Sequence, residues 1–290
     1  MLNFWNQHYL FLVVGLGVSL LSMAAAMIGS SLVFQKQSQL GDAIGHAAYP
    51  GIIAAFMVTQ SRNPFTLLLG AVASGILVLI LIHFFSKEPA FHFESILALV
   101  LSTLFGLGMV LMSYIQGNDN YQGASQAGLK TYIMGQAAFL KQDDVILIAL
   151  VSSITILIFF MALPRIKLSL FDPVFAASIG IDSRKLSLLN LSLAVVVISV
   201  GLKAVGAILI AALLITPTII GMQWSRNYQG VLWVAVGSAV VGSLFGTWLS
   251  TVVDKLATGP SVVLTLFFLA LLSFIIGPQG LIAARGYQHD

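Results

Sequence analysis

The hydrophobic positions of this chain gather into long runs, separated by short polar or Pro/Gly-containing segments. A helix needs about 20 apolar residues in a row to cross the hydrocarbon core of a bilayer. The runs therefore predict an all-α, polytopic membrane protein of about eight to nine transmembrane helices, folded as a single domain over residues 1–290. The predicted spans are 9–34, 43–60, 64–86, 93–115, 144–164, 187–204, 205–224, 229–250 and 260–277.

Two stretches leave the pattern ambiguous. Residues 188–224 are interrupted only by Lys203, so they form either two short helices or one long bent helix. The segment 129–140 is too short to span a bilayer and is expected to be interfacial or re-entrant. The larger share of Lys and Arg falls on the side of the C-terminus, which predicts an outside N-terminus and an inside C-terminus.

Composition supports the membrane assignment and removes several function classes. Of 290 residues, 59% are hydrophobic and 8% are charged, whereas a soluble domain has roughly 25% charged residues. The net charge of +3 comes from scattered basic residues without a basic run, which argues against nucleic-acid binding. The chain has no cysteine, so it can form neither thiolate metal sites nor disulfides. It also has no G-x-x-x-x-G-K-[ST] sequence, so ATP hydrolysis would have to come from another subunit.

The second predicted span begins with an unusual polar stretch, "GDAIGHAAYPG". Asp42 and His46 stand four residues apart and therefore lie on one face of a helix. A carboxylate and an imidazole suit Mn²⁺, Zn²⁺ or Fe²⁺, and ionisable groups inside a span are functional candidates. Pro50 cannot donate to the carbonyl of His46, so a helix break is expected near the site. Alternatively, Asp42 is the N-cap of this helix and His46 donates to a neighbouring helix.

Other ionisable residues are assigned more weakly. Asp254 either completes the metal site, caps the last span or pairs with Lys255. Lys203 is expected to extend its ammonium group to the membrane interface rather than to serve in transport. The remaining histidines are expected at the ends of spans or in the polar tail, as interfacial residues: His8, His83, His92 and His289.

A predicted cytoplasmic loop, 165–185, contains the pattern of a short helix. Asp172 can cap a helix whose first residue is Pro173, and Gly180 can end it about two turns later. Val174, Phe175 and Ile179 form a small apolar face with basic residues on both sides. Such a helix either lies flat on membrane lipid or docks into a groove of a partner protein.

Together these segments resemble the ABC-type metal permeases that take up manganese, zinc or iron in bacteria. "LGDAIGHAAYPG" resembles the second-span motif of that family, usually GDAxSHAxxPG, and "FDPVFAASIGI" resembles its loop to the ATPase. "VGAILIAALLITPTIIG" is similar to its VGxLLVxALLIxPAA segment, and "ATGPSVVL" to the opening of its final span. The matches come in the family's order and cover about residues 30–280.

The resemblance implies a permease subunit in the bacterial plasma membrane that has no enzymatic activity and no permanently bound cofactor. Its expected partners are a second permease copy or a paralogue, two cytoplasmic ATP-binding subunits and an extracytoplasmic metal-binding protein. Asp42 and His46 fall on the metal-contacting positions, with manganese favoured over zinc or iron. The segment 171–181 falls on the coupling helix, whose ATPase-contacting residues would be Phe171, Asp172, Pro173, Phe175 and Gly180.

Two departures from the family pattern leave the metal preference open: Gly45 replaces the usual small hydroxyl residue, and "TPTIIG" replaces "PAATA". Three competing functions remain at this point. An ABC permease for a siderophore or vitamin shares the coupling loop but does not need Asp42 and His46. A proton- or sodium-coupled carrier usually buries acids on several helices, and a membrane metalloenzyme needs more ligands and a catalytic base.

Overall fold

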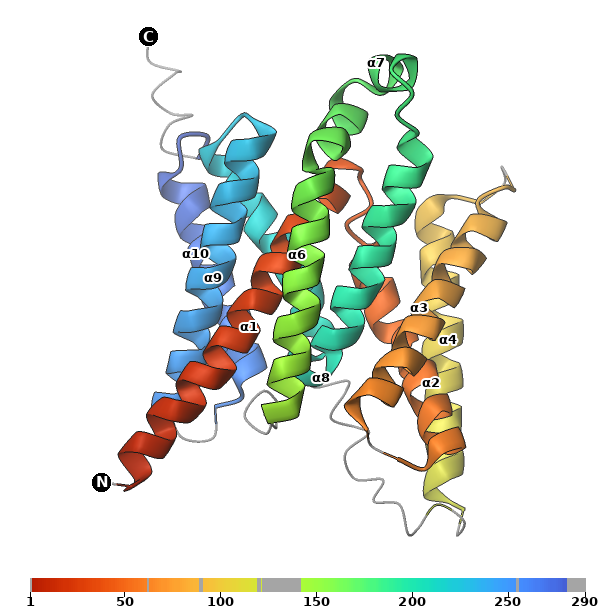
Figure 1. Cartoon of the computed structure of the whole chain (residues 1–290), viewed down its shortest axis with the longest axis vertical. Coiled ribbons are helices and arrows are strands. Elements are labelled where there is room, and N and C mark those ends of the chain that lie inside the picture. The colour runs from red at the N-terminus through yellow and green to blue at the C-terminus, as the bar shows by residue number, and fades with distance from the viewer. Residues whose placement is uncertain are drawn as a thin grey trace.

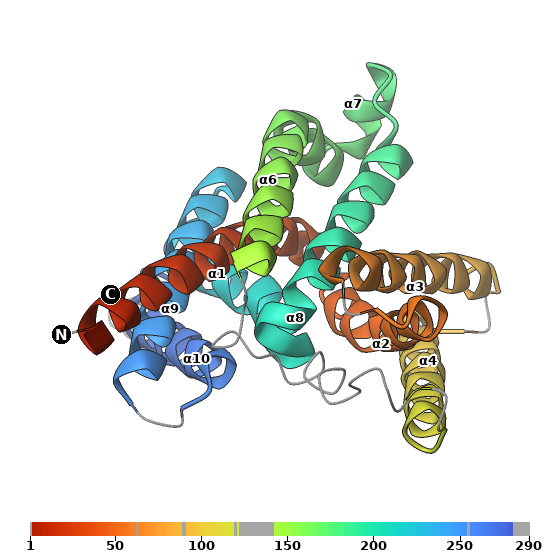
Figure 2. The ribbon, with the colours of Figure 1, turned by 60° about the horizontal axis from the view of Figure 1, so that its bottom comes forward.

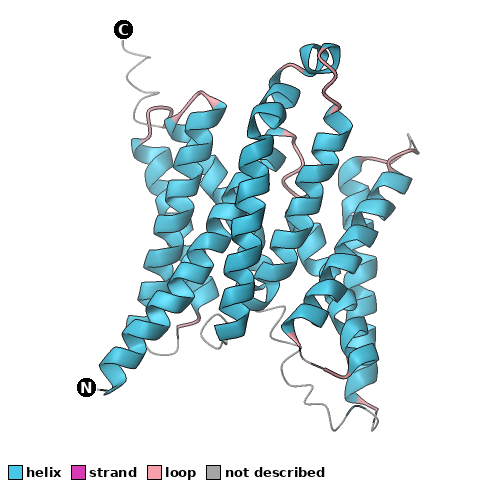
Figure 3. Cartoon of the chain, viewed as in Figure 1, coloured by secondary structure: helices cyan, strands magenta, loops and turns pink. Residues whose placement is uncertain are grey.

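The computed structural model describes residues 2–61, 63–88, 91–118, 121, 142–253 and 256–280, with side chains from residue 14 onward. These residues form helices joined by short loops, without strands in the described ranges (Figure 3). The predicted segment 129–140 lies outside them. The helices are α1 (Leu2–Phe34), α2 (Leu40–Thr59), α3 (Pro64–Phe85), α4 (Phe93–Gln116), α6 (Gln142–Phe171), α7 (Pro173–Ser178), α8 (Ser183–Trp224), α9 (Tyr228–Val252) and α10 (Thr258–Ile276).

The predicted membrane-spanning class is confirmed. Within the described residues, seven helices are long and apolar enough to cross a membrane, and α8 is one of them. α2 is not in this set, because Asp42 and His46 lower its mean hydropathy, although its 20 residues would reach about 30 Å. α8 has 42 residues, about 63 Å of helix, which is twice the thickness of a hydrocarbon core.

The ambiguity in residues 188–224 is settled by a break in α8 at Gly206. This residue has φ 81° and ψ 167°, a conformation that is essentially restricted to glycine. The two arms, 183–205 and 207–224, diverge from the break as a V (Figure 2). The break therefore divides α8 into two helical arms, close to the boundary between the predicted spans 187–204 and 205–224.

α2, α3 and α4 form one group of helices, on the right in Figure 1, and α1, α6, α9 and α10 form another. α8 packs against α1, α6, α9 and α10 and also contacts α2 and α3, so its first arm lines the boundary between the groups. We call this boundary the seam. The N-terminal end of α1 and the short helix α7 lie at opposite ends of the molecule (Figure 1).

α6 continues further than the sequence predicted. The expected span ended at 164, and residues 165–185 were assigned to a loop, but the helix runs through Pro164 to Phe171. The prediction placed the boundary at this proline because Pro-containing segments separate the hydrophobic runs. The helix nevertheless continues because Leu163 and Ile166 are both buried and extend its packed face past the proline. Residues 165–171 therefore belong to α6, and the loop with its short helix is shorter than expected.

Candidate metal site

Asp42 and His46 lie on the first two turns of α2. The helix begins at Leu40 after the N-cap residue Gln39, so Asp42 is inside the helix and is not its N-cap. The Nε2 atom of His46 lies 3.4 Å from Oδ1 of Asp42. A carboxylate in the first turn is also favoured by the positive end of the helix dipole. The capping alternative is therefore wrong, and the two side chains meet on one face as their spacing predicted.

The pair lies on the seam. His46 lines a narrow pocket between three helices, and its ring meets Phe105 of α4 edge-on, with ring centroids 5.4 Å apart. The His46 side chain is 22% exposed and that of Asp42 is 51% exposed. Both groups are therefore partly accessible, and His46 has apolar walls around it. The pocket is lined by Gly45, His46, Tyr49 and Ile52 of α2, Phe105 of α4, and Leu202 and Ala207 of α8.

The donor atoms fit a divalent transition metal that is held by few protein ligands. One carboxylate and one imidazole supply oxygen and nitrogen donors, whereas zinc sites use at least three protein ligands. No group of three or more His, Cys, Asp or Glu side chains suitable for a metal occurs in the part of the chain that the structure describes. The other coordination positions at Asp42 and His46 are thus open to water or to another molecule. Asp254 lies outside the described residues, and its place in the site stays a prediction.

Pro50 lies inside α2 without ending the helix. The hydroxyl of Ser74 on α3 donates to the carbonyl of Ala47, 2.5 Å away, and so satisfies a backbone oxygen next to the proline turn. This bond requires close contact between α2 and α3. The contact occurs at Gly51 and Gly70, where a Cβ atom on either residue would collide with the backbone of the other. The helix break predicted near Pro50 does not occur, because α2 is continuous from Leu40 to Thr59, and the Ser74 bond adds a partner for the carbonyl next to that of His46.

The short helix in the predicted cytoplasmic loop is present as α7. Oδ1 of Asp172 accepts a 2.9 Å hydrogen bond from the backbone N–H of Phe175, and Pro173 occupies the first helical position. At the other end Gly180 has φ +81°, and the N–H of Ile181 donates to the carbonyl of Ala176. This is a Schellman ending. The local prediction of a capped two-turn helix is confirmed.

α7 presents an apolar surface at one tip of the molecule. Val174 is 81% exposed, Phe175 and Ile179 are about half exposed, and Ala176 is buried. Phe171, which precedes α7, is also half exposed. Its ring packs edge-on against Phe34 at the end of α1 and Tyr228 at the start of α9, with centroids 5.7 and 5.8 Å apart. Phe171, the last residue of α6, therefore ties the end of that helix to α1 and α9 just before α7 begins, a contact that the sequence did not indicate.

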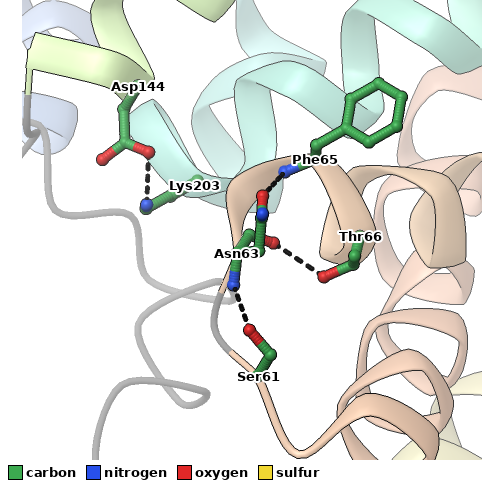
Figure 4. Close-up of polar contacts among 6 residues, drawn as sticks. All are labelled: Ser61, Asn63, Phe65, Thr66, Asp144 and Lys203. Atoms are coloured by element: carbon green, nitrogen blue, oxygen red, sulfur yellow. Dashed lines mark hydrogen bonds and ion pairs between the residues drawn. The ribbon is translucent and has the colours of Figure 1, made fainter.

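Lys203 has a partner that the sequence did not predict. Its ammonium forms an ion pair with Oδ1 of Asp144 at 2.5 Å (Figure 4), and its place relative to the membrane interface stays a prediction. The Asp144 side chain is 2% exposed and that of Lys203 is 29% exposed. Sequence reasoning missed this pair because its members are 59 positions apart. An acid at the start of one apolar span and a lysine at the end of another were the only available signal.

The histidines with described side chains outside the site lie at helix ends, as expected. His83 is in the last turn of α3, where Nη2 of Arg184 is 3.4 Å from its Nε2 atom. His92 precedes α4 and makes no side-chain capping bond. Both are exposed. The side chain of His8 and the whole of His289 lie outside the described residues.

Comparison with known proteins places the chain in a family. The manganese transport system membrane protein MntC of Bacillus subtilis is 38% identical over 94% of this chain, which spans 62% of that protein's length. The zinc transport system membrane protein TroC of Treponema pallidum is 34% identical over 92% of this chain and 88% of its own length.

The fold has a solved counterpart in PsaBC from Streptococcus pneumoniae in complex with Fab. The TM-score is 0.80 at 22% sequence identity, over 92% of this chain and 91% of that one. Residues 7–277, which include α2, α7 and α8, match the ABC 3 transport family, and the chain therefore belongs to that family.

Proposed function

We propose that this chain is the permease subunit of an ATP-driven importer of divalent transition-metal ions, with manganese as the first candidate and zinc and iron as alternatives. The observation that carries the proposal is the Asp42–His46 pair, in which the half-exposed Asp42 lies 3.4 Å from a His46 ring that lines an apolar pocket on the seam. Two relatives named for manganese and zinc transport support this class of cargo. Oxygen and nitrogen donors without sulfur suit Mn²⁺, which prefers carboxylate and water ligands.

A metal site with only two protein ligands on this chain suits transport. A permeation site must bind its ion strongly enough to accept it and weakly enough to release it. The Asp42–His46 pair lies where α2 faces α4 and the first arm of α8. A movement of one group of helices against the other would therefore change access to both donors without breaking α2.

α7 is the proposed contact with a partner ATPase. It leads through Ser183 directly into the first arm of α8, which carries Leu202 to the wall of the metal pocket. Its exposed apolar side chains match helix-in-groove docking. Closure of two ATP-binding subunits would push α7 and tilt this arm, while Phe171 passes the same displacement to α1 and α9.

The remaining partners follow from the same proposal. An extracytoplasmic binding protein would deliver the metal at the end of the molecule opposite α7, where α1 begins (Figure 1). A second copy of the chain, or a paralogue, would complete the transporter and supply further ligands or water-lined walls. ATP would be bound and hydrolysed by the partner subunits, and lipid would surround the exposed apolar helices.

The test is uptake of ⁵⁴Mn²⁺ into proteoliposomes that contain the complete transporter with its binding protein and ATP. Asp42→Ala and His46→Ala are expected to reduce uptake to the level without ATP. Asp143→Ala and His92→Ala, which change exposed residues of the same types, are expected to leave it unchanged. Normal uptake by well-folded Asp42→Ala and His46→Ala transporters would remove the proposed site.

A further inference from the structure

A second polar pocket lies on the seam, near the end of the molecule opposite α7. Asp144 at the start of α6 and Lys203 at the end of the first arm of α8 face each other across it. Its other walls are apolar and come from both groups of helices. Among them are Ile52 of α2, Pro64 and Leu67 of α3, and Ile148 of α6. The ion pair is thus accessible from the seam and is not sealed between α6 and α8.

Ser199 adds an unused donor atom to this pocket. It stands one helical turn before Lys203 on α8, so the two side chains share a face. Ser199 is 4% exposed, and its hydroxyl has no hydrogen-bond partner among the described residues. A buried hydroxyl without a partner is costly and calls for an explanation such as an ion or a water molecule. The pocket therefore combines a carboxylate oxygen, a hydroxyl oxygen and a lysine ammonium.

The two pockets are neighbours. Ile52 of α2 lines both the pocket of Asp144 and the pocket of His46. The adjacent positions Leu202 and Lys203 of α8 likewise face one pocket each. An ion that left Asp144 toward the middle of the seam would meet Ile52 and then His46. The pockets are therefore arranged in series.

We infer that Asp144 and Ser199 form an outer metal subsite, and that Lys203 occupies it as a tethered substitute cation when no metal is present. This inference rests on the proposed function. A buried carboxylate needs a compensating positive charge, and Lys203 supplies it on a flexible, partly exposed side chain. An arriving Mn²⁺ takes the carboxylate and hydroxyl oxygens while the ammonium moves into water. When the metal passes on to His46 and Asp42, Lys203 returns to Asp144.

The test uses Mn²⁺ alone as the probe and counts bound ions by electron paramagnetic resonance on the complete transporter in lipid nanodiscs. The background carries Asp42→Asn and His46→Ala, which removes the inner site. Adding Lys203→Met is expected to create Mn²⁺ binding and a melting temperature that rises with Mn²⁺, because the metal replaces the lost ammonium. Adding Asp144→Asn as well should abolish both the Mn²⁺ binding and the rise in melting temperature. Asp143→Asn, which changes the exposed neighbouring acid, is the control and should abolish neither.

Absence of Mn²⁺ binding in the folded Lys203→Met transporter, or binding that survives Asp144→Asn, would overturn the inference. If Lys203→Met does not fold, the neutral pair Asp144→Asn/Lys203→Gln replaces it, with Asp42 and His46 intact. Uptake at limiting Mn²⁺ should then fall at least about tenfold, since loss of a ligand's hydrogen-bond partner alone already costs that much, and unchanged uptake would equally overturn the inference. Failure of the proposed function looks different, because the unmodified transporter would then bind no Mn²⁺ that depends on Asp42 and His46.

Discussion

The chain contains two ionisable pairs on one seam, and they are built in opposite ways. Asp42 and His46 come from one helix, lie 3.4 Å apart and remain partly exposed. Asp144 and Lys203 come from two helices, lie 2.5 Å apart, and the acid is buried. The first pair keeps its donor atoms available, while the second satisfies its own charge. The proposed inner site therefore differs from the inferred outer one, which holds a cation of its own until a metal arrives, although both contain an aspartate.

Asp42→Asn is expected to distinguish the functions of the two pairs most clearly. Loss of a ligand should reduce Mn²⁺ uptake by at least about 100-fold, the upper end of what loss of a ligand's hydrogen-bond partner costs. The melting temperature should stay the same, because this half-exposed carboxylate holds no other element in place. Uptake and thermal melting of the same preparation check both statements. A variant that melts early and still transports would reverse the assignment of the two pairs.

Lys203→Met, in contrast, should lower the stability of the protein, measured in metal-free buffer. Removing one member of a buried pair takes away the ammonium that lies 2.5 Å from the Asp144 carboxylate and should lower the free energy of unfolding by about 3 kcal/mol. The control Asp144→Asn/Lys203→Gln removes both charges and should cost much less. Thermal melts in the same detergent compare the two, and equal losses would show that the charge balance does not matter there.

Both pockets depend on the break in α8, because Leu202, Lys203 and Ala207 flank Gly206. Gly206→Ala should cost about 2 kcal/mol, since an alanine is strained at φ 81° and ψ 167°. Gly180→Ala, with the same φ but open space around it, is the matched control and should cost about 1 kcal/mol. Limited proteolysis and melting temperature measure the effects. A smaller effect at Gly206 than at Gly180 would contradict a structural role for the break.

The smallest effect is expected outside the seam, at the cap of α7. Asp172→Ala removes the hydrogen bond to the N–H of Phe175 and should cost about 1 kcal/mol of local helix stability. Binding of the ATP-binding subunit should weaken severalfold, while Mn²⁺ binding at Asp42 and His46 stays unchanged. Pull-down titration and Mn²⁺ counting separate the two. Loss of metal binding would show that α7 and the seam are more tightly connected than proposed.

Sequence reasoning worked best where a few adjacent residues decide the structure. The cap at Asp172, the ending at Gly180 and the common face of Asp42 and His46 all follow from spacings of a few residues. It failed at Pro164, where packing of Leu163 and Ile166 outweighs the lost backbone bond. It did not identify Asp144 as the partner of Lys203, because hydropathy shows that a lysine near a span end needs water or a partner but not which one.

By itself, the sequence determined that this chain lies in a membrane, where most of its helices lie along the chain, and that one carboxylate and one imidazole share a helical turn. These properties depend on hydrophobicity and on the 3.6-residue period, which act over short stretches of chain. Only the tertiary structure decided that this turn faces the first arm of α8, that Asp144 meets Lys203, and that Ile52 separates the two pockets. Those relations join residues that are distant in sequence, and they are set by how the helices pack around the break at Gly206.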